Sequence, residues 1–329
     1  MESDSSASRS AAGQSLFSVV VPVYNEEAVL EPFHSRVLQA LVPAGPPFEI
    51  IFVDDGSVDG SAGILDAISR SDSRFKALHF SRNFGHQAAV TAGLRAATGA
   101  CAVVMDADLQ DPPELILDMV AKWREGFEVV YAQKKRRDGS NPLLRLAYYV
   151  YYRLLRRLTN VEVPPDTGDF CLMDRKVVDL LNAMPERNRY VRGLRAWLGF
   201  RQTAIVFERP ARFAGETKYP FRRLVGLATD GVLSLSKAPL RLATYMGFIV
   251  SAASFVLGVF FAIQQLTGTA HAARGWASTI VVVLFLGGVQ LICIGVIGEF
   301  IGRIYDEVKQ RPLYVVDRQT GFESPPWPK

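Results

Sequence analysis

The stretch FSVVVPVYNE, residues 17–26, passes from a continuous apolar run directly into a polar turn. A short β-branched run of this kind is typical of a strand that is buried on both faces of a parallel sheet. Two further segments follow the same pattern, FEIIFVDD (48–55) and CAVVMDAD (101–108). In each, a polar segment with at least one acidic residue comes immediately after the predicted strand.

Outward from these segments, strands alternate with stretches of helical periodicity. Further strands are predicted at 75–80 and 127–131, and helices at 25–41, 86–97 and 112–125. This alternation predicts an α/β fold with a mainly parallel sheet covered by helices on both faces. Because ligands bind at the carboxyl ends of such strands, the three polar segments are expected to form one site.

The composition is more apolar than is usual for a soluble protein and indicates that the chain contains membrane segments. Hydrophobic residues make up 49% of the chain and charged residues 21%, and the mean hydropathy is +0.13. The net charge of +4 is too small to indicate a nucleic-acid-binding protein, whereas a basic patch facing anionic lipid fits it. Cys101, Cys171 and Cys293 form no CxxC pair, which favours a reducing compartment.

Two uncharged segments, 244–263 and 276–298, are each long enough to cross a bilayer core of about 30 Å. Basic residues flank the pair on both outer sides: Arg222, Arg223, Lys237, Arg241, Arg303, Lys309 and Arg311. The loop between the segments has few, so both ends and the preceding domain are expected in the cytoplasm. The chain is therefore predicted to cross a membrane more than once, and the family resemblance given below implies that this is the bacterial inner membrane.

Two amphipathic stretches, 141–159 and 221–240, are predicted to lie at the membrane surface. For the first, an ordinary packing helix with a basic solvent face is the alternative. The domain organisation expected is a disordered N-terminus (1–15), a cytoplasmic catalytic domain (16–219), juxtamembrane helices (220–240), a transmembrane hairpin (241–300) and a cytoplasmic tail (301–329).

Asp106 and Asp108 stand one residue apart where a predicted strand ends. Hard divalent cations take carboxylate and phosphate oxygens, so one or two protein ligands suffice when a substrate supplies the rest. Such an ion neutralises charge on a departing nucleoside diphosphate. Asp54 and Asp55 are placed to accept hydrogen bonds from a nucleobase or ribose, Tyr24 to stack on the base, and Glu26 to contact the nucleoside. His86 is interpreted as a residue that starts a helix, and His79 as a strand residue without a role in a site.

The segments VVVPVYNE, VDDGSVDGS, SRNFGHQAAVTAGL and MDADLQDPPE together resemble the family 2 glycosyltransferases of the GT-A fold, which is a Rossmann-like fold. Within that family the chain is similar to the branch of dolichol-phosphate mannose synthase and bactoprenol glucosyltransferase. The later segments TGDFCLMDRKVV and PERNRYVRGL and the tail with two spans match the same branch. The likeness extends over about residues 17–311.

The resemblance implies an inverting transferase that uses Mg²⁺ or Mn²⁺, a nucleotide diphosphate-sugar donor and a polyprenyl phosphate acceptor. It places Asp108 and Gln110 at the metal and Asp106, Asp108 and Gln110 around the diphosphate. Pro22, Tyr24, Glu26, Asp54 and Asp55 would line the nucleoside pocket. It also implies a homo-oligomer, a tetramer.

Asp169, in the segment TGDF, corresponds to an acid at the active site of the family. A lipid phosphate is already anionic at neutral pH and needs little deprotonation. The hypothesis is therefore that Asp169 orients the sugar hydroxyls or the acceptor, with a general-base role as the second reading.

Cations must offset the repulsion between the acceptor phosphate and the donor diphosphate. The candidates for the acceptor phosphate are Lys134, Arg137 and Arg145. Arg212 and Lys218 lie in a segment, RFAGETK, that resembles the family's mobile loop over the donor. Lys134 departs from the arginine that is usual at that position, and it lacks the bidentate fork of a guanidinium.

The predicted function is transfer of a hexose, glucose from UDP-glucose, to undecaprenyl phosphate for use in the cell envelope. The same acceptor with GDP-mannose, a UDP-N-acetylhexosamine or a UDP-amino-arabinose donor is the alternative, since one or two side chains set such a choice. A non-catalytic membrane scaffold that binds nucleotide sugar is an alternative of another class. A channel or transporter is disfavoured, because neither span contains a charge.

Overall fold

The computed structural model describes residues 16–134, 167–187, 189–207, 238–267 and 276–323. Contacts divide the chain into two compact units. The first holds the described residues up to 207 together with those from 311 onward, and the second holds two long helices.

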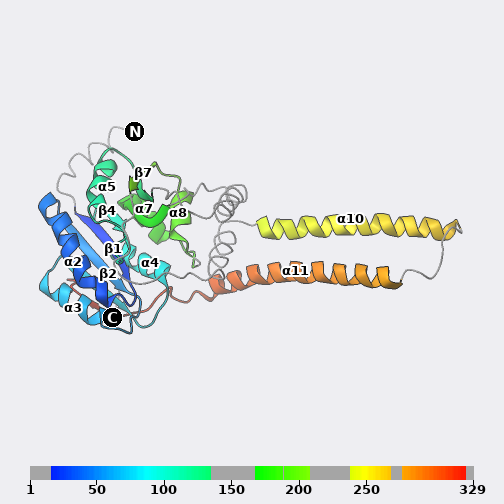
Figure 1. The fold of residues 1–329 in the computed structure, drawn as a ribbon, viewed down its shortest axis with the longest axis horizontal. Coiled ribbons are helices and arrows are strands. Elements are labelled where there is room, and N and C mark those ends of the chain that lie inside the picture. The colour runs from blue at the N-terminus through cyan, green and yellow to red at the C-terminus, as the bar shows by residue number, and fades with distance from the viewer. Residues whose placement is uncertain (1–15, 135–166, 188, 208–237, 268–275, 324–329) are drawn as a thin grey trace. The chain divides into compact units, whose positions relative to one another are not determined.

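A single mixed sheet forms the centre of the first unit (Figure 1). The described residues contribute eight strands in the spatial order β7-β5-β6-β4-β1-β2-β3-β8. Their bounds are β1 Phe17–Val23, β2 Phe48–Asp54, β3 Phe75–Phe80, β4 Cys101–Val104, β5 Val129–Lys134, β6 Thr167–Asp174, β7 Gln202–Phe207 and β8 Val316–Thr320. Four of the seven strand pairs are parallel, and only pairs with β6 or β8 are antiparallel. The predicted α/β fold with a mainly parallel sheet is confirmed.

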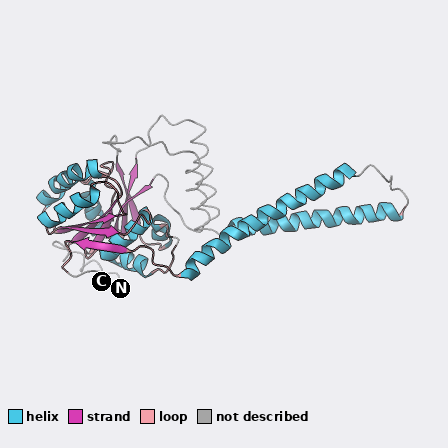
Figure 2. Ribbon diagram, turned by 90° about the horizontal axis from the view of Figure 1, so that it is seen from below, coloured by secondary structure: helices cyan, strands magenta, loops and turns pink. Residues whose placement is uncertain are grey.

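Helices cover both faces of the sheet (Figure 2). Because side chains alternate along a strand, Val19 and Val21 of β1 face one core cluster and Val20 faces the other. Helices α2 (Glu27–Leu41), α3 (Ser61–Ser71) and α5 (Leu115–Arg124) pack on the first face, and α4 (His86–Ala96), α7 (Arg175–Ala183) and α8 (Val191–Trp197) on the second. A short 3-10 turn, η2 (Val42–Ala44), follows α2.

Three elements differ from the prediction by two residues or more at one end or both. The helix predicted from residue 25 begins at Glu27, because Asn25 has a φ of 56° and so lies in the left-handed region. The helix predicted over 112–125 is observed as α5, Leu115–Arg124, after two prolines. The strand predicted over 127–131 is observed as β5, Val129–Lys134.

The last strand of the sheet was not predicted. Residues after 300 were expected to form a tail, but the hairpin's second helix runs to Lys309 and β8 then pairs antiparallel with β3. Strand β8 is short, largely exposed and carries Asp317 and Arg318. Such a strand has no apolar run, so the hydrophobic pattern gave no signal for it.

Helix α4 approaches β1 closely at Gly93. A Cβ atom added to Gly93 would lie 2.2 Å from Cγ1 of Val20 in β1. Glycine is therefore required here for space, and the close packing fixes α4 against the middle of the sheet.

The second unit consists of α10 (Ala238–Leu266) and α11 (Trp276–Lys309). Each contains a window that is long and apolar enough to cross a membrane, Ala243–Phe260 and Phe285–Lys309, and almost none of either window is buried within the protein. Exposed apolar helices of this length are suited to a lipid environment. The stretch 141–159 lies outside the described residues, as do 1–15 and all of 221–240 except the start of α10 at Ala238.

Candidate active site

The carboxyl ends of β1, β2 and β4 bring the three polar segments of the sequence together. Val23 of β1 lies opposite Asp54 of β2, and Val20 lies opposite Val104 of β4. Asp106 follows Val104 by two residues and is therefore alongside the end of β1. The prediction that these segments meet at one edge of the sheet agrees with the observed strand register.

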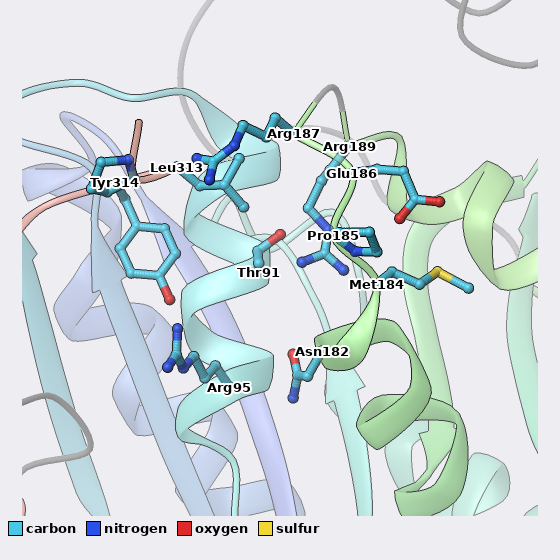
Figure 3. Close-up of a pocket in the computed structure, with 11 residues that line it drawn as sticks. Thr91, Arg95, Asn182, Met184, Pro185, Glu186, Arg187, Arg189, Leu313 and Tyr314 are labelled. Carbon is cyan, nitrogen blue, oxygen red and sulfur yellow. The ribbon is translucent and has the colours of Figure 1, made fainter. Parts of the chain in front are cut away.

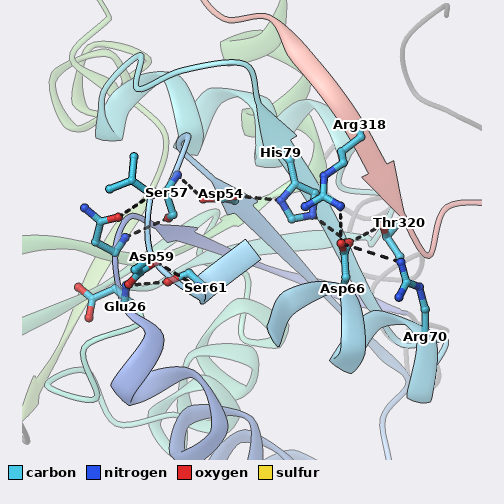
Figure 4. Close-up of polar contacts among 12 residues, drawn as sticks. Glu26, Asp54, Ser57, Asp59, Ser61, Asp66, Arg70, His79, Arg318 and Thr320 are labelled. Carbon is cyan, nitrogen blue, oxygen red and sulfur yellow. Dashed lines mark hydrogen bonds and ion pairs between the residues drawn. The ribbon is translucent and has the colours of Figure 1, made fainter. Parts of the chain in front are cut away.

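Asp54 belongs to a set of side chains that we call the β8 network, in which Asp54, Asp66 and His79 are buried (Figure 4). Its five members are Asp54, Asp66, His79, Arg318 and Thr320. Nδ1 of His79 is 2.9 Å from Oδ2 of Asp54, and Nε2 is 3.1 Å from Oδ1 of Asp66. Thr320 donates to Asp66 at 2.7 Å, and Arg318 pairs with the same carboxylate.

This network holds Asp54 in place. Oδ1 of Asp54 accepts a hydrogen bond from the Ser57 amide at 2.9 Å, so both carboxylate oxygens have protein partners. Burial alone would raise the pKa of Asp54, but the contacts with His79 and Ser57 hold that pKa below its usual value. The predicted contact of Asp54 with a nucleoside stays a prediction.

The two loops after β1 and β2 are joined by hydrogen bonds. The Asn25 amide donates to Oγ of Ser57 at 3.0 Å, and the Val58 amide donates to Oδ1 of Asn25 at 2.9 Å. The Glu26 amide donates to Oγ of Ser61 at 2.9 Å. Tyr24 precedes these contacts and is 45% exposed, so its ring is accessible for stacking.

Asp55 is buried and fixes the start of α4. Its carboxylate accepts hydrogen bonds from the amides of Phe84 at 2.7 Å and Gly85 at 2.9 Å. Burial raises the pKa of Asp55, and these two amide contacts oppose the rise. Because Gly85 is followed by His86, Asp55 places the His86 side chain.

Around His86 the structure gathers a second group, which we call the His86 cluster: His86, Asp55, Asp106, Asp169 and Arg192. Nε2 of His86 is 3.2 Å from Oδ2 of Asp169, and Arg192 of α8 donates to Oδ1 of Asp169, also at 3.2 Å. Burial would lower the pKa of His86, but the hydrogen bond with Asp169 and the charges of Asp106, Asp169 and Asp55 raise it.

Asp169 lies on β6, a strand antiparallel to β4, close to the start of that strand. Burial favours its neutral form, but hydrogen bonding to His86 and the charge of Arg192 hold the pKa of Asp169 well below its usual range. A carboxylate with so low a pKa is ionised at neutral pH and is a poor proton acceptor. The arrangement supports an orienting role over a general-base role.

The loop after β4 is tightly constrained. Oδ1 of Asp108 accepts from the amide of Gln110 at 3.1 Å, and Gln110 and Asp111 are buried. Leu109 between them has a φ of 58°, which is uncommon for a residue with a branched side chain. Strained backbone of this kind is concentrated at functional sites.

The residues present fit a divalent cation that is shared with a substrate. In the described part of the chain no three His, Cys, Asp or Glu side chains gather closely enough to hold an ion by themselves. Asp106 and Asp108 are half-buried at a strand end, where carboxylate oxygens remain reachable from solvent. A hard cation bound there would take further ligands from phosphate oxygens.

The remaining predicted residues fall into two groups. Pro22 is buried at the carboxyl end of β1, where it lies opposite Val53. Lys134 is the last residue of β5, and its side chain is not described. The other four predicted cations, Arg137, Arg145, Arg212 and Lys218, lie outside the described residues.

His86, His79 and Arg192 were not predicted as parts of a site. His86 does start α4, as interpreted, but it also pairs with a predicted acid. Its position just beyond the carboxyl end of β3, on the edge that carries the other acids, was a usable signal. His79 and Arg192 had none, because their partners lie 25 and 23 residues away.

Comparison with known proteins identifies both units. Residues 18–181 match the model of glycosyl transferase family 2, and residues 238–304 match the GtrB C-terminal hairpin. The uncharacterized glycosyltransferase YkcC of Bacillus subtilis is 48% identical over 94% of this chain and 95% of its own length. The prophage bactoprenol glucosyl transferase homolog of Escherichia coli is 39% identical over 92% and 98%, and the bactoprenol glucosyl transferase of Shigella phage SfII is 40% identical over 92% and 97%.

Proposed function

The chain belongs to glycosyl transferase family 2, and we propose that it transfers a hexose from a nucleotide diphosphate-sugar to a polyprenyl phosphate. The proposed donor is UDP-glucose and the proposed acceptor undecaprenyl phosphate. The observation that carries the proposal is the pairing of Asp169 with His86 and Arg192, at 3.2 Å each, at the edge of the sheet where β2 and β4 lead into Asp55 and Asp106. Relatives named bactoprenol glucosyl transferases support the acceptor.

The donor would bind across the carboxyl ends of β1, β2 and β4. Tyr24 would stack on the base, and Pro22, Glu26, Asp54 and Asp55 would line the nucleoside pocket. Asp108 and Gln110 would hold Mg²⁺ or Mn²⁺, with Asp106 beside the diphosphate. When bound, the ion offsets the negative charge that develops on the leaving diphosphate. Arg212 and Lys218 would close over the donor.

The reaction is a single displacement with inversion. An oxygen of the acceptor phosphate attacks the anomeric carbon, and the bond from that carbon to the donor diphosphate breaks, so the nucleoside diphosphate leaves with the bonding electrons. Asp169, ionised and fixed by His86 and Arg192, would orient the sugar hydroxyls or the acceptor. Lys134, Arg137 and Arg145 would offset the charge of the acceptor phosphate.

The two long helices suit an acceptor that resides in lipid. Helices α10 and α11 expose apolar side chains along windows long enough to span a bilayer. The protein is proposed to be a homo-oligomer, as the family resemblance implies, and to lie in the bacterial inner membrane with its catalytic unit in the cytoplasm. This placement follows the basic residues that flank the hairpin in the sequence.

The experiment that tests this function uses the purified full-length chain with undecaprenyl phosphate and Mg²⁺ or Mn²⁺. Each of UDP-glucose, GDP-mannose, a UDP-N-acetylhexosamine and a UDP-amino-arabinose is supplied with a radiolabelled sugar, and label is counted in the organic phase. UDP-glucose is expected to give labelled lipid. The variant Asp108→Ala should give none, and retained product in that variant would defeat the catalytic assignment of this site.

A further inference from the structure

The part of the chain that follows the second long helix belongs to the unit that holds the sheet. Residues 311–323, which we call the C-terminal segment, begin two positions after Lys309, the last residue of α11. Residues 312–314 line a cavity of about 300 Å³ together with Thr91 and Arg95 of α4 (Figure 3). Strand β8 then pairs with β3. Two sets of contacts lead from this segment to the acids of the proposed nucleoside pocket.

The first set of contacts crosses three neighbouring strands. Asp54 of β2 lies opposite His79 of β3, and His79 lies opposite Arg318 of β8. Residues directly opposite one another in neighbouring strands present their side chains on the same face of the sheet. Asp66 joins this row from α3, since its carboxylate binds Nε2 of His79 at 3.1 Å and the hydroxyl of Thr320 at 2.7 Å (Figure 4). The side chains of β8 are thus linked to Asp54 through two intermediates.

The intermediates of this row are buried and have little freedom to move. Each ring nitrogen of His79 contacts one carboxylate, so the two acids together fix the orientation of the imidazole. Oδ1 of Asp66 is shared between His79 and Thr320. Loss of the Thr320 hydroxyl would let Asp66 shift, and the ring would then turn relative to Asp54. Groups in one buried hydrogen-bond network are energetically coupled in this way.

The second set of contacts fixes the loop between β3 and α4. The Ser81 amide donates to the carbonyl of Val315 at 3.1 Å. The ring of Tyr314 stacks on Phe80, with 5.0 Å between centroids, and Phe84 packs edge-on against Phe80 at 5.7 Å. Aromatic pairs with these geometries stabilise the elements that they join. Residues 314 and 315 therefore hold the loop at both of its ends.

This loop in turn packs on the loop after β2. The Phe84 amide donates to Oδ1 of Asp55 at 2.7 Å. Gly56 has a φ of 69°, and a Cβ atom added to it would lie 2.4 Å from the carbonyl carbon of Arg82. The two loops therefore cannot move independently. The C-terminal segment supports Asp54 by the first set of contacts and Asp55 by the second.

We propose that the C-terminal segment is part of the donor-binding site, with Thr320 and Arg318 as positioning residues. They act on Asp54 through Asp66 and His79. This inference rests on the proposed function, in which Asp54 lines the nucleoside pocket. Because the segment continues from α11, the chain completes its donor site only after it has formed the hydrophobic hairpin.

Steady-state kinetics of the full-length chain in phospholipid nanodiscs, with the acceptor saturating and the donor varied, tests the proposal. Thr320→Val removes the bond to Asp66 and keeps the size of the side chain, so the KM for UDP-glucose should rise about threefold. The kcat should change little, because the lost contact affects binding and not the reacting atoms. Thr320→Ser keeps a hydroxyl and should restore the KM. Arg318→Gln should raise the KM as Thr320→Val does.

Thr98→Val is the matched control, because it removes the same group from the same kind of bond. The Thr98 hydroxyl donates at 2.8 Å to Glu49, a buried acid near the start of β2, whose last residue is Asp54. This variant should lower the urea midpoint, as Thr320→Val does, and leave the KM for the donor unchanged. An equal rise of the KM in both variants would indicate a general loss of stability and would overturn the proposal.

Hydrogen exchange separates this inference from the proposed function, because it requires no substrate. The Ser57 amide donates to Asp54, so the peptide that contains Ser57 should exchange faster in Thr320→Val than in the wild type or Thr98→Val. Equal exchange in all three would overturn the positioning of Asp54, whether or not the chain transfers sugar. Faster exchange with an unchanged KM in an active enzyme would overturn the role in donor binding. Faster exchange in a chain whose wild type transfers no sugar would defeat the proposed function and support the link from β8 to Asp54.

Discussion

The β8 network and the His86 cluster use the same kinds of side chain for different ends. In the β8 network, His79 lies between two carboxylates that are each completed by further donors, Ser57 on one side and Thr320 on the other. In the His86 cluster, three carboxylates from separate strand ends act on one imidazole. His79 bridges two acids within the fold and supports it, whereas His86 pairs with Asp169 at the edge of the sheet where ligands bind in such folds.

The largest effect is expected from Asp169→Asn. The substitution keeps the shape of the side chain but removes the charge that His86 and Arg192 hold, and loss of one preorganised electrostatic contact typically costs about 10²–10³ in kcat. Activity is measured as lipid-linked sugar formed per minute. If Asp169 orients its partner, the pH–rate profile keeps its shape while activity falls, and loss of the acid limb of the profile would instead assign it as the base.

Asp174→Asn is the matched control, since it makes the same change on the same strand. Asp174 lies at the other end of β6, where it accepts from Nε1 of Trp123 at 2.7 Å and caps α7 through the Lys176 amide. The variant Asp174→Asn should lower the unfolding temperature of the protein and leave the activity per folded molecule nearly unchanged. Equal loss of activity in both variants would remove the distinction between the two ends of the strand.

The second effect concerns stability. Asp66→Ala deletes the acceptor shared by His79, Thr320 and Arg318 and leaves the buried ring of His79 without one of its two partners, which should cost about 3 kcal/mol in the free energy of unfolding. Urea denaturation of the full-length chain measures the loss. Asp72→Ala is the control. Asp72 directly follows α3 and its ion pair with Arg74 is more exposed, so this variant should lose only about 1 kcal/mol in the free energy of unfolding. An equal loss in both would show that β8 is not held by Asp66.

The contrast between the two groups also explains what the sequence could reveal. The ends of β1, β2 and β4 were predictable, because apolar runs followed by acids are local patterns and parallel strands share an edge. The partners of those acids were not. Asp66 and Thr320 are 254 residues apart, and no periodicity or spacing connects them. The role of Asp55 in fixing the amides before His86 likewise depends on a turn whose shape the sequence did not specify.

A third and smaller effect is expected at Tyr24, an exposed aromatic residue that follows the carboxyl end of β1. Stacking of a base on an aromatic ring contributes about 1 kcal/mol at the lower end of measured values, so Tyr24→Ala should raise the KM for the donor about fivefold. Tyr24→Phe keeps the ring and should change KM little. Steady-state kinetics at saturating acceptor separates the two, and a similar rise in both variants would mean that the hydroxyl makes the contact.

The smallest effect is a dependence of stability on pH that His86 contributes. Burial lowers the folded-state pKa of His86, but the contact with Asp169 and the charges of Asp106 and Asp55 outweigh burial and raise that pKa overall. The protonated form is therefore favoured by folding, and its stabilisation is fully present below the ordinary histidine pKa of about 6.5 and is lost as pH rises through the raised value. Urea midpoints measured across this window should fall with pH in the wild type and less steeply in His86→Gln.

His34→Gln should change the pH dependence of stability in the opposite direction, because the pKa of His34 is lowered by folding whereas that of His86 is raised. His34 on α2 packs edge-on against Phe75 at 4.6 Å between ring centroids, and burial lowers its pKa. Folding favours its neutral form, so its contribution is present above the ordinary pKa and is lost as pH falls through the lowered value. Removing His34 should therefore flatten the acid side of the stability curve, while removing His86 flattens the alkaline side. Two variants with the same slope change would contradict the charge environment that distinguishes the His86 cluster.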